Sequence, residues 1–207
     1  MADARALLVK ADATERVRQT LRESAAVKDR ICRSPEVLAA VVAAAEAMTQ
    51  ALLNGHKLLF FGNGGSAADA QHLTAEFTGR FMAKGRKPLA AVCLTANTSS
   101  LTAIGNDFSF DEVFAREVQA LGQPGDIAVG ISTSGRSANV LKAFAAAKAA
   151  RVMTIGLTGR DGGLMTSASD IAVIVPSDDT QRIQESHIAI GHAWCELVEN
   201  AYLAHTR

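Results

Sequence analysis

The sequence predicts an α/β protein, a parallel sheet of about five strands covered by helices on both faces. Three observations predict this class. Short apolar runs of strand length alternate with helical stretches from residue 57 onward. The strands are almost continuously apolar, which indicates burial on both faces. A glycine-rich turn joins the first strand to its helix, as is typical of the carboxyl edge of such a sheet.

The chain of 207 residues has the size of one ordinary domain, and its 48% apolar residues suffice for a core. Residues 1–55 are expected to form helices without strands, and residues 57–207 to form the sheet and its loops. No repeat or Pro/Gly-rich linker separates these parts. Residues 1–207 are therefore predicted to be a single domain.

Composition argues against several classes of partner. Basic and acidic residues number 21 each, so no overall basic field attracts nucleic acid or an acidic membrane, and neither is expected as a partner. The three cysteines fit neither a disulfide framework nor a zinc knuckle. The amino terminus lacks a signal-peptide pattern, and the apolar run Leu38–Ala45 is too short to span a membrane. A cytoplasmic protein is expected.

Two helices are predicted before the sheet. Ala13–Val27 is helical in pattern but strongly charged, so it is expected on the surface or against a partner subunit. Ser34-Pro35-Glu36 predicts the start of the second helix, with Ser34 as its N-cap, and Asn54-Gly55 predicts its end. Apolar residues occur on nearly every face of this second helix, which favours burial on two sides. Another subunit can supply the second covering surface.

The first strand, Lys57–Phe61, enters the glycine turn Gly62–Ser66, and a helix follows with Ser66 as the expected N-cap. Strands and helices then alternate to the end of the chain. The strands are Leu89–Leu94, Asp126–Ile131, Val152–Leu157 and Ile171–Val175, and the helices are Asp111–Ala120, Ala138–Ala149 and Ile183–Tyr202. Because loops after parallel strands gather at one edge of the sheet, the chemistry is expected there.

The glycine turn is a candidate anion site. Glycine permits positive φ and close approach of a ligand, and free N–H groups meet the positive end of a helix dipole there. The spacing of Gly62, Gly64 and Ala67 also fits a dinucleotide fingerprint. No acidic residue ends the next strand to bind a ribose, which argues against nicotinamide or flavin. A plain strand-to-helix connection remains the alternative.

The loop 130–137, GISTSGRS, offers four hydroxyls just before a helix, a composition suited to a phosphate. It nearly matches a Walker A motif, with Gly130, Gly135 and Ser137 in register. Arg136 stands in place of the motif's lysine, and no convincing aspartate is available for magnesium, so an ATP site is not expected. A loop that only caps its helix is the alternative.

Titratable residues gather on two helices. His72 and Glu76 lie four apart on one helix face, either as an exposed pair or as two ligands of one metal. The segment QRIQESHIAIGH places Gln184, His187 and His192 on the last helix. His187 and His192 point about 140° apart, so they are not expected to face the same site.

Six motifs carry a resemblance to a known family. They are GNGGSAADAQH, AEFTGRF, TAIGNDF, GISTSGRSANV, LTGRDGG and RIQESHIAIGH, in that order. Together they closely resemble the phosphoheptose isomerases, enzymes of the sugar isomerase (SIS) fold. This family converts sedoheptulose 7-phosphate into D-glycero-D-manno-heptose 7-phosphate through an enediol, the first step of nucleotide-activated heptose biosynthesis. The resemblance implies an aldose–ketose isomerase.

The resemblance also implies roles for individual residues. Glu76 falls on the family's catalytic glutamate and His192 on its catalytic histidine. The zinc ligands of the family, one ion per subunit, fall on His72, Glu76, Gln184 and His192. Substrate-binding positions fall on Asn63, Gly64, Gly65, Ser66, Glu76, Asn106, Asp107, Ser132, Thr133, Ser134, Ser137 and Gln184. Family members are homotetramers with active sites at subunit contacts.

Two questions stay open at this point. Gln184 and His192 are eight residues apart, about 12 Å along a continuous helix, which is too far for both to ligate one ion. Either the helix begins after Gln184, or neighbouring subunits share the site. The SIS fold also serves in non-catalytic modules, as a replication-initiator adaptor or a sugar-phosphate sensor. Such a module has no use for Glu76 opposite His192, which favours the enzyme.

Overall fold

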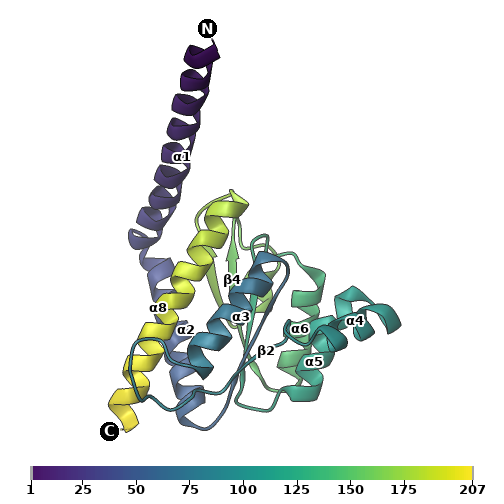
Figure 1. Cartoon of the computed structure of the whole chain (residues 1–207). Helices are drawn as coiled ribbons and strands as arrows, with labels where there is room; N and C mark the ends of the chain where they lie inside the picture. Colours follow the sequence, from purple (N-terminus) through teal and green to yellow (C-terminus); the bar gives the residue numbers. More distant parts are fainter. Residues whose placement is uncertain (1, 207) are drawn as a thin grey trace.

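The computed structural model describes residues 2–206, with side chains from Asp12 onward. It contains a parallel sheet with strand order β2-β1-β3-β4-β5 (Figure 1). The strands are β1 (Leu58–Gly62), β2 (Ala91–Cys93), β3 (Ile127–Ser132), β4 (Met153–Gly159) and β5 (Ile171–Val175). The predicted five-stranded α/β class is therefore confirmed.

Helices cover both faces of the sheet. One core cluster joins α2, α3 and α8 to one face, and a second joins α5, α6 and α7 to the other. The helices are α1 (Ala2–Cys32), α2 (Pro35–Leu53), α3 (Gly65–Thr78), α4 (Thr98–Asp107), α5 (Val113–Leu121), α6 (Ala138–Ala149), α7 (Met165–Ala168) and α8 (Thr180–Thr206), with a 3₁₀ turn at Phe110–Glu112.

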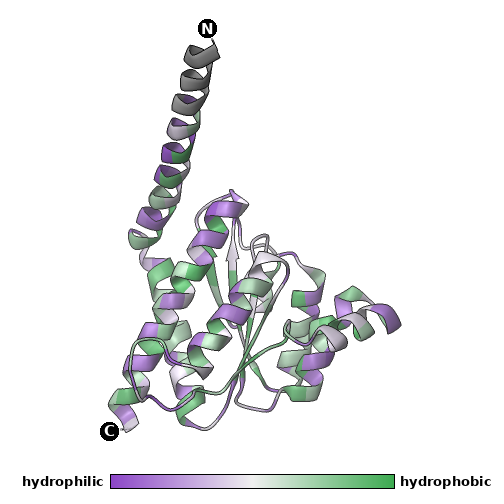
Figure 2. Ribbon diagram, viewed as in Figure 1, coloured by the Kyte–Doolittle hydropathy of each residue, from purple (hydrophilic) through white to green (hydrophobic). Residues whose placement is uncertain are grey.

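The strand β1 shows why its sequence is apolar at every position. Successive side chains of a strand point to opposite faces, and here both faces are covered. Phe60 stacks on Phe77 of α3 with ring centroids 5.7 Å apart. On the other face, Phe61 meets the ring of Phe144 of α6 edge-on at 5.9 Å. The apolar colour therefore follows the strands through the middle of the molecule (Figure 2).

Several predicted boundaries are confirmed. The helix α6 and the strand β5 have the predicted ranges. The helix α2 begins and ends at its predicted signals, because the Ser34 hydroxyl accepts the Val37 N–H at 3.3 Å and Asn54 is the C-cap. The predicted edge strand 89–94 is shorter in the structure, since β2 pairs with β1 alone.

Other predictions were wrong. Ser66 is not the N-cap of α3, which begins at Gly65 with Gly64 as its cap at a φ of 56°. Glycine adopts this positive φ without strain, so the chain turns into the helix two residues earlier than predicted. The helix α4 was not predicted either. It has no buried residue and so no apolar periodicity to detect, and it starts where the Asn97 side chain accepts the Ser100 N–H at 3.1 Å.

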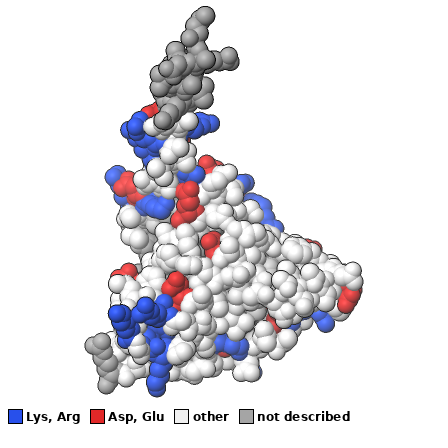
Figure 3. Space-filling model, in the orientation of Figure 1, with Lys and Arg blue, Asp and Glu red and all other residues white. Residues whose placement is uncertain are grey.

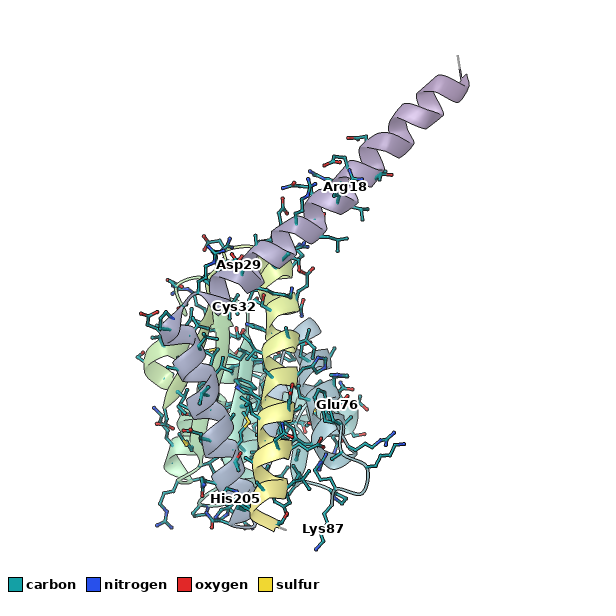
Figure 4. The ribbon with its side chains drawn as sticks, turned by 90° about the vertical axis from the view of Figure 1, so that its left-hand side faces the viewer. Arg18, Asp29, Cys32, Glu76, Lys87 and His205 are labelled. Atoms are coloured by element: carbon teal, nitrogen blue, oxygen red, sulfur yellow. The ribbon has the colours of Figure 1, made fainter. Side chains whose placement is uncertain are left out.

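The first helix is longer than the predicted range 13–27 and projects from the body (Figures 1 and 4). Val27 and Ile31, near its end, are buried, whereas Val17 and Leu21 are 60% and 65% exposed. On the face shown in Figure 3, basic side chains gather at the lower left, near the C-terminal end, and acidic and basic side chains are mixed toward α1, so both signs are present. This agrees with the zero net charge of the chain.

By length and composition α2 also resembles a membrane-crossing helix, since its most apolar 18 residues have a mean hydropathy of 1.5. Of this stretch, 39% is buried inside the protein. Such a test is also passed by core helices of globular proteins. Here α2 packs against α8, where the Trp194 indole donates to the Val41 carbonyl at 3.0 Å. Ala44 and Met48 on the same helix are fully buried. Packing against the sheet therefore accounts for the apolar composition of α2.

A buried histidine fastens α8 to the sheet. His187 is fully buried, and its Nε2 lies 3.1 Å from the Thr158 carbonyl oxygen at the end of β4. Because a carbonyl only accepts, Nε2 carries the hydrogen. Burial lowers the pKa of His187 to about 4, against the weaker opposing effect of the Thr158 carbonyl. The imidazole is therefore neutral at pH 7.

We expect this histidine to weaken the fold in acid. The pKa of His187 is about 4 in the folded chain and 6.5 as its ordinary value, so the unfolded chain binds more protons between these pH values. Stability is therefore lost as pH falls through this window, by about 3 kcal/mol in total at 1.36 kcal/mol per pKa unit.

His187→Phe lacks this contribution. The test is the free energy of unfolding in urea for wild type and variant, measured at pH 7 and at pH 4. Between these pH values the wild type should lose about 3 kcal/mol more than the variant. Burial raises the pKa of Asp69 to about 6, which acts with the opposite sign but is common to both proteins and cancels. A difference that stays constant with pH would contradict this prediction.

Candidate functional site

The strand order predicts a crevice between β1 and β3 at the carboxyl edge of the sheet. These strands are neighbours, yet β1 leads into α3 on one face and β3 leads into α6 on the other. The two connections therefore diverge and leave a gap between them, which is where α/β proteins of this type bind ligands. The glycine turn forms one wall of this crevice, and the serine-rich loop 132–137 forms the other.

The glycine turn presents bare backbone. A side chain at Gly62 would collide with the Ile131 carbonyl at 2.7 Å, so β1 and β3 approach closely there. A side chain at Gly64 would meet no atom within 4 Å, which leaves the backbone open to a ligand. The amide of Gln184 lies over Gly65, because a Cβ there would come within 1.7 Å of its Nε2. The structure thus brings Gln184 to the turn.

The serine loop gathers its hydroxyls at the start of α6. The Ser132 hydroxyl lies 2.8 Å from that of Ser137 and 3.5 Å from that of Ser134. Gly135, at a φ of 63°, presses against the turn after β4, since a Cβ would stand 2.0 Å from the Gly162 carbonyl. The predicted phosphate-binding residues Ser132, Thr133, Ser134 and Ser137 therefore share one loop wall, with Ser132 buried and the others half-buried.

The side chain of Asn63 is engaged with the protein itself. Its Nδ2 donates to Oδ1 of Asn139, and Nδ2 of Asn139 donates back to Oδ1 of Asn63, both at 2.9 Å. The backbone of Asn63 remains part of the glycine turn between β1 and α3. Ser66, predicted to bind substrate beside it, is only 5% exposed within the first turn of α3.

Further along α3, two histidines from different helices meet. His72 Nε2 lies 2.8 Å from His192 Nε2 of α8, and Glu76 Oε1 lies 3.5 Å from His72 Nε2. The His72 side chain is 46% exposed and that of Glu76 is 23% exposed, so this cluster opens to the surface beside α8 (Figure 4). The predicted meeting of the α3 and α8 side chains is thus present, and His187 points elsewhere, as predicted.

A buried ion pair holds this cluster in place. Arg86 donates to Glu199 of α8 at 2.6 Å, with the two side chains 1% and 4% exposed. The same guanidinium donates to the Glu76 carbonyl at 2.9 Å, near the end of α3. Glu199 also accepts the backbone N–H groups of residues 81–83, which places the Phe81 ring 5.7 Å from the ring of His192.

The helices α3 and α8 run in the same direction. Gly65 lies against Gln184, His72 against His192, and the segment at Phe81 against Glu199, so the pairing keeps one register along both helices. Because α8 already begins at Thr180, the option that the helix begins after Gln184 is wrong. Within the protomer, Gln184 lies about 12 Å along the helix from His192 and is not brought to the histidine pair.

The donor chemistry of the pair fits zinc. Two histidines and a carboxylate form a known catalytic zinc set, and ligand nitrogens about 2.0–2.1 Å from one ion stand about 3.3 Å apart in a tetrahedron. The two Nε2 atoms lie 2.8 Å apart, which is a hydrogen-bond distance and shorter than the spacing of two ligands around one ion. Within residues 2–206, moreover, no three His, Cys, Asp or Glu side chains are arranged as a complete metal site. The protomer therefore offers a partial donor set.

Asn106 and Asp107 lie apart from the rest of the candidate site. They end α4, are both exposed, and bond to each other through Asn106 Nδ2 and Asp107 Oδ1 at 2.8 Å. Figure 1 shows α4 on the side of the molecule away from α8. The protomer does not bring these two predicted substrate residues to the histidine pair.

Three residues that shape the site were missed in the sequence. Asn139, Arg86 and Glu199 are lone polar residues whose partners are remote in the chain, 76 positions away for Asn139 and 113 for the ion pair. No spacing rule links residues so far apart. A polar residue inside an otherwise apolar helix, as at Glu199 and Asn139, is the one available signal.

Comparisons with known proteins identify the family of this chain. The SIS domain family model matches residues 22–159. The phosphoheptose isomerase of Rhodospirillum rubrum is 55% identical over 162 residues, 78% of this chain and 86% of the relative. That of Aquifex aeolicus is 50% identical over 186 residues, 89% of this chain and 95% of the relative.

The solved structure of phosphoheptose isomerase GmhA from Neisseria gonorrhoeae has a TM-score of 0.84 and 48% identity, and the match covers 90% of this chain and 98% of that one. The family model spans more than half of the chain, and near-full-length relatives share about half of its residues. The chain therefore belongs to the SIS domain family and, within it, to the phosphoheptose isomerases.

Proposed function

We propose that this protein is an aldose–ketose isomerase that converts sedoheptulose 7-phosphate into D-glycero-D-manno-heptose 7-phosphate. The observation that carries the proposal is the cluster of His72, His192 and Glu76 on the same helix pair that begins at the anion crevice. The names of the relatives support it and do not support the non-catalytic module. A cytoplasmic location, where sugar phosphates are metabolised, goes with this activity.

The crevice suits the phosphoryl end of the substrate. Backbone N–H groups of the glycine turn, the hydroxyls of the serine loop and the N-termini of α3 and α6 all favour a dianion. Along α3, seven residues separate Gly65 from His72, a rise of about 10 Å. An extended heptose 7-phosphate spans a similar length, on the order of 10 Å from its covalent bonds, between its phosphorus and its first carbon.

The reaction needs one base, one acid and stabilisation of an oxyanion. Glu76 takes the proton from C1 of the ketose and returns it to C2, which leaves the carbonyl at C1. His192 serves as the acid that opens the sugar ring, gives a proton to O2 as the enediol forms, and takes the proton of O1 as the carbonyl forms at C1. Arg86 holds the end of α3 through the Glu76 carbonyl, and Phe81 limits the orientation of His192.

Zinc is the metal that this donor set favours. His72, His192 and Glu76 would hold the ion, with Gln184 joining only if another subunit supplies it. When bound, zinc would polarise the substrate carbonyl and orient its oxygens.

A homotetramer with shared active sites is part of the proposal. Two apolar grooves of about 250 and 240 Å³ flank α2 and α8, and Leu38 and Val42 on α2 are 43% and 46% exposed. A second subunit covering this face would bury α2 on two sides. Subunit packing would also let Asn106 and Asp107 of one chain reach the crevice of another.

Glu76→Gln is expected to lower kcat by about 10²–10⁴-fold, the range that a positioned general base supplies. Binding of sedoheptulose 7-phosphate, measured by calorimetry, should change little because the phosphate contacts remain. Glu196→Gln, an exposed carboxylate change on α8, serves as the control and should be unaffected. Near-normal turnover in Glu76→Gln would refute the assigned role.

Removing the metal with a chelator is expected to abolish turnover, and adding Zn²⁺ should restore it. Zinc bound per chain gives an independent readout. The zinc affinity of His72→Ala should fall by more than the roughly 10–100-fold that loss of an outer-shell partner costs, so this variant should retain little zinc. His205→Ala, an exposed histidine at the end of α8, should keep its zinc. Full activity after exhaustive chelation would remove zinc from the proposal.

Val42→Glu is expected to reduce the assembly from four chains to smaller species, because it places a charge in an apolar contact. Mass measured by light scattering on a sizing column checks this, and activity should fall with the assembly since subunits share the site. Val42→Thr, which keeps the shape without the charge, is the matched control. A fully active monomer would contradict the shared site.

A further inference from the structure

A reciprocal amide pair lies at the base of the crevice. Asn63 belongs to the turn after β1, and Asn139 belongs to the first turn of α6. Their two hydrogen bonds, both 2.9 Å, use one donor and one acceptor of each amide. Asn139 is only 3% exposed, so the pair is an interior contact rather than a surface one.

This pair of asparagines joins the glycine turn to the serine loop beyond the point where the β1–β3 ladder ends. The ladder between β1 and β3 ends with Gly62 opposite Ile131. Beyond it, the hydrogen bonds of the described backbone do not link residues 63–66 to residues 132–137. The side-chain amides of Asn63 and Asn139 cross this gap, while the connecting helices depart to opposite faces of the sheet.

The serine loop is braced on its other side as well. The Met165 N–H donates to the Gly135 carbonyl at 3.1 Å, and Arg136 pairs with Asp161 at 2.6 Å across the same contact. The turn after β4 therefore fixes one side of the loop. Asn139 fixes the end that faces the glycine turn.

The geometry points to Asn139 as a positioning residue for the phosphate site. By pairing with Asn63 it sets the distance between the backbone N–H groups of the turn and the hydroxyls of the loop, so that one phosphoryl group meets both. Asn63 then acts on the ligand through its backbone, while its side chain serves the pair. This inference rests on the proposed function in taking a sugar phosphate as the ligand.

The two amides satisfy each other's hydrogen-bonding groups. A buried amide without a partner is costly, so each asparagine stabilises the position of the other. Losing either one frees both walls and weakens every contact that needs them together. Since phosphate contacts are the same in the bound and the reacting substrate, the loss should appear in KM rather than in kcat.

Asn139→Leu keeps the branching of the side chain and removes both hydrogen bonds. We expect KM for sedoheptulose 7-phosphate to rise about tenfold, the effect of two net hydrogen bonds, with kcat little changed. The affinity for inorganic phosphate, measured by calorimetry, should fall by the same factor. Asn63→Leu should match it, and the double variant should cost no more than either single one because the two amides act as a unit.

Thr154→Val is the matched control. It removes a buried hydroxyl that donates to Asp170 at 2.7 Å, near the opposite end of β4, so Tm should fall while KM stays unchanged. If Asn139→Leu likewise lowers only Tm, the inference is overturned. It is also overturned if Asn63→Leu raises KM while Asn139→Leu does not, because Asn63 then binds the substrate directly.

The two failures can be told apart. If the wild-type protein binds inorganic phosphate but does not isomerise sedoheptulose 7-phosphate, the proposed function fails, and the phosphate affinities of the variants still decide the role of Asn139. If Asn139→Leu does not fold, Asn63→Leu carries the test, since Asn63 is only half-buried. Unchanged phosphate affinity in that variant would overturn the inference.

Discussion

The arrangement of the site depends on one constraint of the sheet: two neighbouring parallel strands, β1 and β3, send their helices to opposite faces. The connections must diverge, so a gap opens at their ends and nothing in the ladder fills it. Both walls consist of short, glycine-containing turns that lead directly into the N-termini of α3 and α6. A site for an anion thus follows from strand order before any catalytic side chain is considered.

The same architecture positions the cluster of His72, Glu76 and His192 indirectly, through the helices α3 and α8. The helix α3 starts at the crevice and carries His72 and Glu76 away from it, and α8 runs beside it in one register. The spacing between the phosphate site and the His72 side of the cluster is therefore a number of helical residues, which a rigid helix keeps constant. Such a ruler suits a substrate whose charge and reacting carbons lie at opposite ends.

The sequence predicted those parts whose signal is local. Near-continuous apolar runs identified β1, β3 and β5, and glycines and serines identified the two walls of the crevice. The pair His72 and Glu76 followed from helical spacing. The helix α4 was missed because it is short, contains no fully buried residue and depends on the Asn97 cap, and the N-cap of α3 was misplaced because Gly64 adopts a positive φ there.

Contacts between remote residues were beyond the reach of sequence patterns. The prediction that His192 meets the side chains of α3 came from family resemblance, and the Asn139 and Arg86 contacts came only from the structure. The register of α3 against α8 is set by tertiary packing, for instance by Leu73 against Gly191, which leaves no mark on the periodicity of either helix. Gln184 was grouped with His192 by the family resemblance alone, and within the protomer the fold separates them.

The segment 79–90 contains neither helix nor strand, yet Glu199 accepts the N–H groups of Met82 and Ala83 at 2.8 Å, and Arg86 inside it is almost fully buried. Amide exchange there should be as slow as in a helix, because opening the segment means breaking a desolvated charge pair. A stretch whose surface is mostly exposed is thus anchored to the interior through Arg86 and Glu199.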